Sequence, residues 1–302
     1  MESDIKLKQK LNTAASFKAQ GKHLHAIQIY EQLIREFPDD PNLHFELAEL
    51  YELSGSLNSS MNLLETYLEN NQFNADAKFF YGQFLLKKQL WEKAIEVFSS
   101  FQPEDKPLSS FFLGYAYFMV KDYELARINF LSFLNEHVDR ELEYQANIFL
   151  AKIEIELKDF ERALEFAKQS ELLFNSYWEL YRIFAECYNN LGMNTHAVTS
   201  IEKAIKLNPK ETELYETAGR VYKNAGDYHK AEQYFIKYVE SSENINPITF
   251  TNLGETYLKL DKLNSAKNYF ELALKIDPNN LTAINGLEQL SLKRKSSISK
   301  NV

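Results

Sequence analysis

Residues 247–280 read PITFTNLGETYLKLDKLNSAKNYFELALKIDPNN, and this stretch decides the fold. Two small residues within it, Gly254 and Ala266, stand twelve positions apart. Large apolar side chains surround them at helical spacing, Tyr257 near the first and Phe270 near the second. Apolar residues at i, i+3 and i+4 are typical of amphipathic helices. The stretch therefore predicts a hairpin of two helices whose axes approach closely at the two small residues.

The same arrangement recurs along the whole chain with a period of about 34 residues. Counting outward gives units at 7–40, 41–74, 75–106, 107–140, 144–177, 178–211, 212–245 and 247–280. The small residues of the predicted first helices are Ala14, Ala48, Gly82, Gly114, Ala151, Ala185, Gly219 and Gly254. Those of the predicted second helices are Ala26, Ser60, Ala94, Ala126, Ala163, Ala197, Ala231 and Ala266. A period of this length predicts stacked helical hairpins, so the expected fold class is all-α.

Glycine and proline mark the boundaries of these helices. Four glycines, Gly21, Gly55, Gly192 and Gly226, each follow the small residue of a first helix by seven positions. A short turn between helices uses a positive φ at such a place, which glycine adopts readily. All seven prolines of the chain lie between the proposed units. Proline stops or begins a helix, so the predicted helix interiors are free of breakers.

These residues resemble the tetratricopeptide repeat, most completely in Asn252-Leu-Gly-Glu-Thr-Tyr257 followed by Ala266, Phe270, Ala273 and Asp277-Pro278. The resemblance implies a right-handed α-solenoid of about eight hairpins, with a concave face lined by the first helices. An amphipathic last segment, residues 281–294, is expected to cap the stack. We therefore expect one superhelical domain over residues 1–294 and a flexible tail over residues 295–302.

Two units depart from the pattern. The third is two residues short, and about three extra residues precede the fifth. The fifth unit also has Glu154, Ala167 and Ser170 where large apolar side chains usually stand. We therefore expect looser packing and a local change of superhelical twist near residues 140–177.

Composition narrows the classes of partner. The chain has 34 Lys and Arg against 43 Asp and Glu, a net charge of −9, which repels nucleic acid and anionic membrane surfaces. The sequence contains no apolar run of about 18 residues, so it predicts no segment that inserts into a membrane. The single cysteine, Cys187, excludes an internal disulfide and fits a reducing compartment, so a cytoplasmic location is expected.

No pattern in the sequence points to catalysis, to a cofactor or to a metal site. Cys187 stands in the middle of a predicted first helix and is interpreted as a small buried thiol rather than a nucleophile. His23 and His25 flank a turn without a recurring cysteine or carboxylate partner, so they are interpreted as exposed turn residues. The chain is predicted to be non-enzymatic, with no cofactor and no metal.

The family resemblance places the second, fifth, ninth and twelfth residues of each first helix in the groove. In the third to fifth units these positions are mostly apolar, and in the sixth and seventh units they are charged. The predicted partner-binding residues are Phe79, Gln83, Phe111, Tyr115, Phe118, Lys152, Arg182, Glu186, Arg220 and Lys223. An apolar groove that passes into a charged one suits a peptide or an amphipathic helix of another protein. The alternative is that the aromatic side chains only pack between neighbouring repeats.

The leading functional hypothesis is a non-catalytic scaffold or adaptor that holds a segment of a partner protein in this groove. A second hypothesis is a structural or assembly protein that self-associates through an end of the stack. The apolar stripe of the last segment is Leu281, Ile284, Leu287 and Leu290. A third hypothesis, a regulatory subunit of an enzyme complex, differs from the first only in the identity of the partner.

Overall fold

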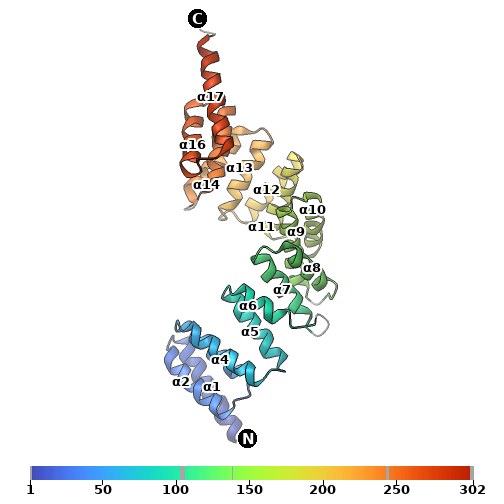
Figure 1. Ribbon diagram of the computed structural model, residues 1–302, viewed down its shortest axis with the longest axis vertical. Coiled ribbons are helices and arrows are strands. Elements are labelled where there is room, and N and C mark those ends of the chain that lie inside the picture. The colour runs from blue at the N-terminus through green and yellow to red at the C-terminus, as the bar shows by residue number, and fades with distance from the viewer. Residues whose placement is uncertain (1, 103–105, 138, 243–244, 300–302) are drawn as a thin grey trace. The chain divides into compact units, whose positions relative to one another are not determined.

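The structure is a computed structural model that describes residues 2–102, 106–137, 139–242 and 245–299. The described residues form helices joined by short turns and contain no strand, so the all-α prediction is confirmed (Figure 1). The chain divides into two compact units, Met1–Glu136 and His137–Val302.

Helices of the first unit pack side by side in consecutive pairs. They are α1 (Glu2–Ala19), α2 (His23–Glu36), α3 (Pro41–Leu53), α4 (Leu57–Asn70), α5 (Ala75–Lys87), α6 (Trp91–Phe98), α7 (Pro107–Met119) and α8 (Tyr123–Leu134). The second unit continues the same pairing. Its helices are α9 (Arg140–Glu156), α10 (Phe160–Leu173), α11 (Trp178–Asn190), α12 (Asn194–Leu207), α13 (Glu213–Asn224), α14 (Tyr228–Ser241), α15 (Pro247–Lys259), α16 (Leu263–Ile276) and α17 (Leu281–Ser299).

The turns inside the pairs follow the predicted glycine pattern. Gly21, Gly55, Gly192 and Gly226 have φ values between +71° and +84°. Four other turns place a larger residue in the left-handed region, namely Gln89, Lys121, Lys158 and Asp261. The left-handed position is therefore a property of the turn, and glycine is the residue that adopts it without strain.

Each glycine at a first-helix packing position lies against a phenylalanine of the second helix. A Cβ added at Gly219 would lie 2.4 Å from the Phe235 ring, and one added at Gly254 would lie 2.5 Å from the Phe270 ring. Gly82 and Gly114 meet Phe98 and Phe130 in the same way. These phenylalanines are among the largest fully buried side chains of the protein. The absence of a Cβ is thus what allows a whole ring to pack between the two helices.

Pairs with alanine at the packing position carry a different side chain opposite it. Ala48 and Leu64 are both buried in one cluster, as are Ala185 and Ile201 in another. In α9 and α10 the corresponding residues are Ala151 and Ala167, both fully buried. A first-helix glycine is therefore paired with a phenylalanine, whereas these first-helix alanines are paired with a smaller apolar side chain. The predicted rule of small residues in register is confirmed by this packing.

Helices α9 and α10 are not loosely packed, in contrast to the expectation for residues 140–177. Ala163, Ala167 and Ser170 are fully buried, and Glu154 is only 1% exposed. The small residues of α10 allow α9 to approach, so they close the interface rather than leave it open. The Glu154 carboxylate lies 3.5 Å from Nε of Arg162, which balances its charge.

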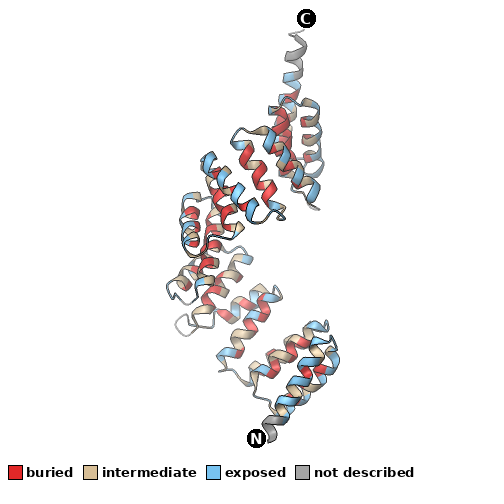
Figure 2. Cartoon of the chain, turned by 180° about the vertical axis from the view of Figure 1, so that it is seen from behind, coloured by how far each residue is buried: buried red, intermediate tan, exposed pale blue. Residues whose placement is uncertain are grey.

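Buried residues run along the inner side of each helix pair (Figure 2). In the second unit one apolar core is continuous from Tyr144 to Leu290. Helix α17 contributes Ala283 and Leu290 to this core and packs against α15 and α16. The helix extends to Ser299, beyond the predicted end at residue 294, and residues 300–302 lie outside the described residues.

Candidate functional site

The ten predicted partner-binding residues fall into two sets, one on each unit. In the first unit α5 carries Phe79 and Gln83, and α7 carries Phe111, Tyr115 and Phe118. In the second unit the set is Lys152 on α9, Arg182 and Glu186 on α11, and Arg220 and Lys223 on α13.

Phe79 belongs to an aromatic cluster. Its ring makes edge contacts with Phe98, Phe101 and Phe112 at centroid distances of 5.6, 5.9 and 5.6 Å. The ammonium group of Lys106 lies 5.5 Å from the same ring, a cation–π contact. The Phe79 side chain is half-buried, so part of its ring still faces outward. Gln83, one turn along the same helix, is exposed.

Phe111 lies in the core of the first unit. Only 4% of the residue is exposed, and its ring contacts Phe130 and Phe133 at 5.7 and 5.3 Å. For this residue the structure favours packing between helices over contact with a partner. Tyr115 and Phe118 are half-buried, and their rings contact Trp91 and Tyr123 at 5.9 and 6.0 Å.

The charged set of the second unit belongs to a row of ion pairs on four first helices, which we call the polar ladder. Lys152 of α9 pairs with Glu179 of α11 at 2.7 Å. On α11, Arg182 pairs with Glu186 at 3.3 Å, and Arg220 of α13 reaches the same Glu186 at 3.8 Å. The residues of the polar ladder are Lys152, Glu179, Arg182, Glu186, Glu216, Arg220, Lys223, Asn252 and Glu255.

The far end of the polar ladder joins α13 to α15. The Arg220 Nε atom donates to Glu216 at 2.9 Å on the same helix. The Lys223 ammonium group donates to Asn252 at 2.6 Å and to Glu255 at 2.5 Å. Positive and negative groups therefore alternate along the ladder, and each cation has a carboxylate partner.

Arg220 is the centre of this network. Burial by itself would lower the pKa of its guanidinium, but the carboxylates of Glu216 and Glu186 outweigh burial and raise the pKa. The Arg220 side chain remains 28% exposed. A guanidinium group offers fork-like donors that suit a carboxylate.

Two hollows border the polar ladder. One, of about 290 Å³, is lined by α9 and α11 with Ile148, Phe149 and Trp178 as its apolar wall and Lys152 and Glu179 as its polar edge. The other, of about 580 Å³, shares Glu216 and Arg220 with the ladder and is closed by residues 245–248 at the start of α15. Ile248, in its wall, is 56% exposed. The first-helix face of the second unit thus combines fixed charges with apolar recesses.

The predicted partner-binding set contains five members of the polar ladder, namely Lys152, Arg182, Glu186, Arg220 and Lys223. Their contact with a partner stays a prediction. Glu216 and Glu255 were omitted from the predicted site, as were Phe149 and Trp178 of the hollow. A signal for the charged partners was present, because opposite charges on neighbouring first helices recur at about one repeat. The sequence contained no indication that Phe149 lines a hollow, because this placement depends on how α9 and α11 pack.

The described residues offer little for catalysis or metal binding. Burial raises the pKa of the Cys187 thiol to about 12, so the thiolate is not formed at neutral pH. Across the described ranges there is no cluster of three or more His, Cys, Asp or Glu side chains that could hold a metal ion. Among the same residues no helix is both long enough and apolar enough to cross a bilayer.

Comparisons with known proteins agree with this architecture. Models of the tetratricopeptide repeat match residues 18–78, 58–109, 179–211, 200–233 and 247–280. Anaphase-promoting complex subunit 3 of Schizosaccharomyces pombe is 25% identical over 220 residues, which is 72% of this chain and 32% of that protein. The chain thus spans about a third of the length of this curated relative.

Solved structures show the same fold. The crystal structure of the APC/C hetero-tetramer Cut9–Hcn1 matches with a TM-score of 0.64 at 15% identity, covering 93% of this chain and 55% of that one. The C-terminal part of a tetratricopeptide repeat protein from Cytophaga hutchinsonii matches with a TM-score of 0.53 at 20% identity, covering 74% and 88%. With recurring repeat matches in both units and this shared fold, the chain belongs to the tetratricopeptide repeat family.

Proposed function

We propose that this chain is a non-catalytic protein-interaction scaffold and that the first-helix face of its second unit holds a peptide or helical segment of a partner. The observation that carries the proposal is the polar ladder and its two bordering hollows. One hollow lies beside Lys152 and Glu179, and the other lies beside Glu216 and Arg220. Fixed charges set the register of a bound segment, and apolar recesses receive its anchoring side chains.

The energetics of such a surface are sufficient for a specific complex. An apolar side chain that becomes fully buried contributes roughly 1.5–3 kcal/mol. Two or three anchors support micromolar binding once the costs of association are subtracted. The ion pairs of the polar ladder are already in place, so little side-chain ordering is required when the partner arrives.

We propose a second, mainly aromatic contact surface on the first unit. Phe79, Tyr115 and Phe118 are half-buried and Gln83 is exposed, so parts of these side chains are available for contact. Phe111 is assigned a supporting role, since its buried ring holds α7 against α8. We propose Phe79, Gln83, Tyr115 and Phe118 as contact residues on this unit.

A multi-protein assembly is the setting that the relatives favour. The Schizosaccharomyces pombe relative is, by name, a subunit of the anaphase-promoting complex. We propose that the present chain likewise acts as one subunit of a protein assembly, in the cytoplasm, without contact to nucleic acid and without insertion into a membrane. Its partner is a protein, and no cofactor is required.

Affinity capture from the native cell, followed by titration of the identified partner, tests this function. Phe149→Ser combined with Lys152→Glu removes an apolar wall and reverses a charge at the hollow between α9 and α11. We expect at least about a tenfold loss of affinity, the equivalent of about 1.4 kcal/mol. Leu172→Ser is the matched control, because Leu172 is 75% exposed on α10 and lines neither hollow of this face.

Equal affinity of the double variant and the control would contradict the assignment of this surface. Circular dichroism of each variant establishes that the helices remain folded. If the aromatic surface of the first unit carries the binding instead, Phe118→Ser will weaken the complex while the double variant does not. That result would move the proposed site to α5 and α7.

The alternative of self-association receives less support from the structure. The apolar stripe of the last segment packs inside the protein, with Leu290 4% exposed and Leu287 against the core. Leu281 remains 72% exposed but stands alone at the start of α17. Light scattering over a range of concentrations tests this alternative, because a monomer at every concentration would count against self-association.

A further inference from the structure

The hollow between α9 and α11 contains a polar group that the protein itself leaves unsatisfied. Tyr144 of α9 is only 4% exposed, and its hydroxyl is buried without a hydrogen-bond partner among the described residues. A buried hydroxyl without a partner is costly, so most such groups in proteins are paired. The Tyr144 hydroxyl interacts electrostatically with Glu179, Tyr177 and Glu141, and all three also line this hollow. The unpaired hydroxyl is therefore directed toward the hollow.

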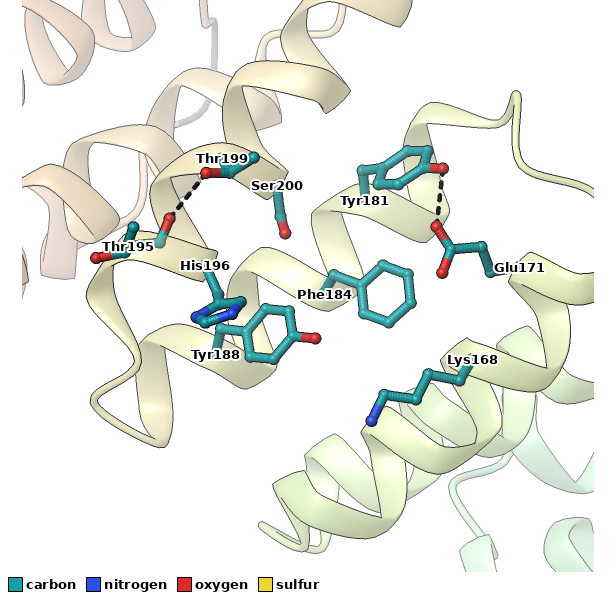
Figure 3. Close-up of a pocket in the computed structure, with 9 residues that line it drawn as sticks. All are labelled: Lys168, Glu171, Tyr181, Phe184, Tyr188, Thr195, His196, Thr199 and Ser200. Atoms are coloured by element: carbon teal, nitrogen blue, oxygen red, sulfur yellow. Dashed lines mark hydrogen bonds between the residues drawn. The ribbon is translucent and has the colours of Figure 1, made fainter.

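Another hollow of the second unit, between α10, α11 and α12, shows the usual outcome. Its wall includes Tyr181, which is as deeply buried as Tyr144 (Figure 3). The Tyr181 hydroxyl donates to Glu171 at 3.2 Å, as the dashed line in Figure 3 shows, and accepts a hydrogen bond from Lys203. Tyr144 thus differs from Tyr181 in lacking a partner rather than in burial.

The charges around the Tyr144 hydroxyl are not balanced. Two carboxylates, Glu141 and Glu179, and one ammonium group, that of Lys152, line the hollow. Lys152 pairs with Glu179 at 2.7 Å, whereas no cation of the described ranges pairs with Glu141. Burial, and after it the charge of Glu179, raises the pKa of Tyr144, so the hydroxyl stays neutral. The excess of negative charge favours a cation over an anion as the group that enters.

Aromatic faces make up much of the remaining wall. Phe149, Tyr177 and Trp178 line the hollow, and Tyr177 is 41% exposed. The negative face of an aromatic ring attracts a cation. The protein already makes one such contact here, because the Lys152 ammonium group lies 5.1 Å from the Phe149 ring. Rings beside an unpaired carboxylate form an environment that suits a guanidinium or ammonium group.

We propose that this hollow binds an arginine side chain of the partner segment. The guanidinium pairs with Glu141, donates to the oxygen of the Tyr144 hydroxyl and stacks on an aromatic ring of the wall. Arginine suits the site better than lysine, because its planar group has five N–H donors and can reach a carboxylate and a hydroxyl at once. This inference rests on the proposed function and names the chemistry of the partner at one of its hollows.

Tyr177 controls access to the Tyr144 hydroxyl. Its ring lies 4.9 Å from that of Tyr144, and its own hydroxyl lies 3.3 Å from Glu141, which is long for an O–H···O bond. Tyr177 stands directly before α11, outside the helix. A guanidinium that reaches Glu141 replaces this long hydrogen bond with a charge-assisted one. Tyr177 then turns aside, and the Tyr144 hydroxyl becomes accessible.

The test uses the full chain and two peptides. One is acetyl-Gly-Arg-Gly-amide, and the other has citrulline in place of arginine, which keeps the shape of the side chain without its charge. The indole N–H signal of Trp178 reports binding by NMR, and that of Trp91, in the first unit, is the internal reference. We expect a saturable shift of the Trp178 signal with the arginine peptide and at least about fivefold weaker binding of the citrulline peptide.

Two substitutions separate the charge of the site from its hydroxyl. Glu141→Gln should weaken binding of the arginine peptide by about two- to fivefold. Tyr144→Phe should weaken it by about tenfold, while the thermal midpoint stays equal to or above that of the wild type, because the lost hydroxyl had no partner. A hydroxyl with a structural role would instead lower the midpoint when removed. Glu165→Gln is the matched control, because Glu165 is exposed on α10 and does not line the hollow.

Equal binding of the arginine and citrulline peptides, or an unshifted Trp178 signal, would overturn the proposal. Unchanged binding of the arginine peptide by both Glu141→Gln and Tyr144→Phe would overturn it as well. The proposed function still stands after such results if Phe149→Ser with Lys152→Glu weakens binding of the captured partner. Unchanged partner affinity of that double variant contradicts the proposed surface, whatever the peptides show.

Discussion

Helices α7 and α13 are each the first helix of a helix pair, yet the same three repeat positions behave differently on them. On α7 these positions are Phe111, Tyr115 and Phe118, and on α13 they are Glu216, Arg220 and Lys223. Phe111 is buried against the rings of α8, whereas Glu216 is half-buried and accepts a hydrogen bond from Arg220 at 2.9 Å. Position in the repeat fixes where the Cα atom lies.

The chemistry of the side chain then decides its direction. A phenylalanine at this place gains free energy by burial against the second helix, while a carboxylate would lose its hydration there. The comparison shows that a first-helix position is not in itself a binding position. A position can contact a partner only if its side chain stays at least partly exposed, as those of the polar ladder do.

The largest expected effect comes from the buried member of the pair. Phe111→Ala should lower the free energy of unfolding by roughly 3–5 kcal/mol, because it leaves a cavity between α7 and α8. Glu216→Ala should cost about 1 kcal/mol or less, since it removes a surface ion pair. The two tryptophans, Trp91 in α6 and Trp178 in α11, allow urea unfolding to be followed in each unit by fluorescence.

Backgrounds with Trp178→Phe or Trp91→Phe assign the signal to the first or the second unit. The shift of the urea midpoint caused by Phe111→Ala should be greatest in the fluorescence of Trp91, which lies in the same unit. If Phe111→Ala and Glu216→Ala shift their transitions equally, the two positions do not differ in burial and the comparison fails.

The packing between the helices of a pair provides the next largest effect. Gly219→Ala should cost roughly 1–3 kcal/mol, because the new Cβ would lie 2.4 Å from the Phe235 ring. Gly114→Ala should cost less, because its Cβ would meet Phe130 at 3.1 Å. In the background of Phe235→Leu, Gly219→Ala should be better tolerated, as Ala48 is beside Leu64. Thermal melting of the four variants checks this order.

The polar ladder is expected to be sensitive to salt. Arg220→Ala should destabilise the second unit by about 0.5–1 kcal/mol in dilute buffer. The difference from wild type should shrink between about 0.1 M and 1 M NaCl, as the Debye length falls from about 10 to 3 Å. The midpoint of urea unfolding, followed by Trp178 fluorescence, measures this difference in stability. Phe111→Ala is the control, because its effect on stability should persist at high salt.

The smallest predicted effect is a loss of stability in acid that is concentrated in the first unit. Burial alone would raise the pKa of Glu52, but hydrogen bonds from Lys88 and Lys87 outweigh it and lower the pKa. A hydrogen bond from Tyr81, with the nearby Lys93, likewise lowers the pKa of Glu65. A depressed folded-state pKa contributes stability above the ordinary value of 4.5 and loses it as the pH falls through the folded value.

We therefore expect the urea midpoint at Trp91 to fall more than that at Trp178 as the pH is lowered below 4.5. Substitution of both carboxylates, Glu52→Gln with Glu65→Gln, should remove the extra acid sensitivity of the first unit. An equal fall at the two tryptophans in the wild type would count against this electrostatic difference.

The candidate sites show which features could be predicted from the position of a residue in its repeat. It placed Arg182, Glu186, Arg220 and Lys223 on one surface, because each stands at a fixed place in its repeat. It did not separate Phe111 from Phe118, which differ in burial although both are aromatic.

By itself, the sequence determined the helical hairpins, their period and the close approach of their helices. Those features depend on local periodicity and on the size of residues such as Gly219 and Ala231, and both can be read from the sequence. Only the tertiary structure decided which side chains remain at the surface, which hollows stay open and which charges pair. These outcomes depend on the summed volumes of neighbouring side chains, and packing at that scale is a property of several helices at once.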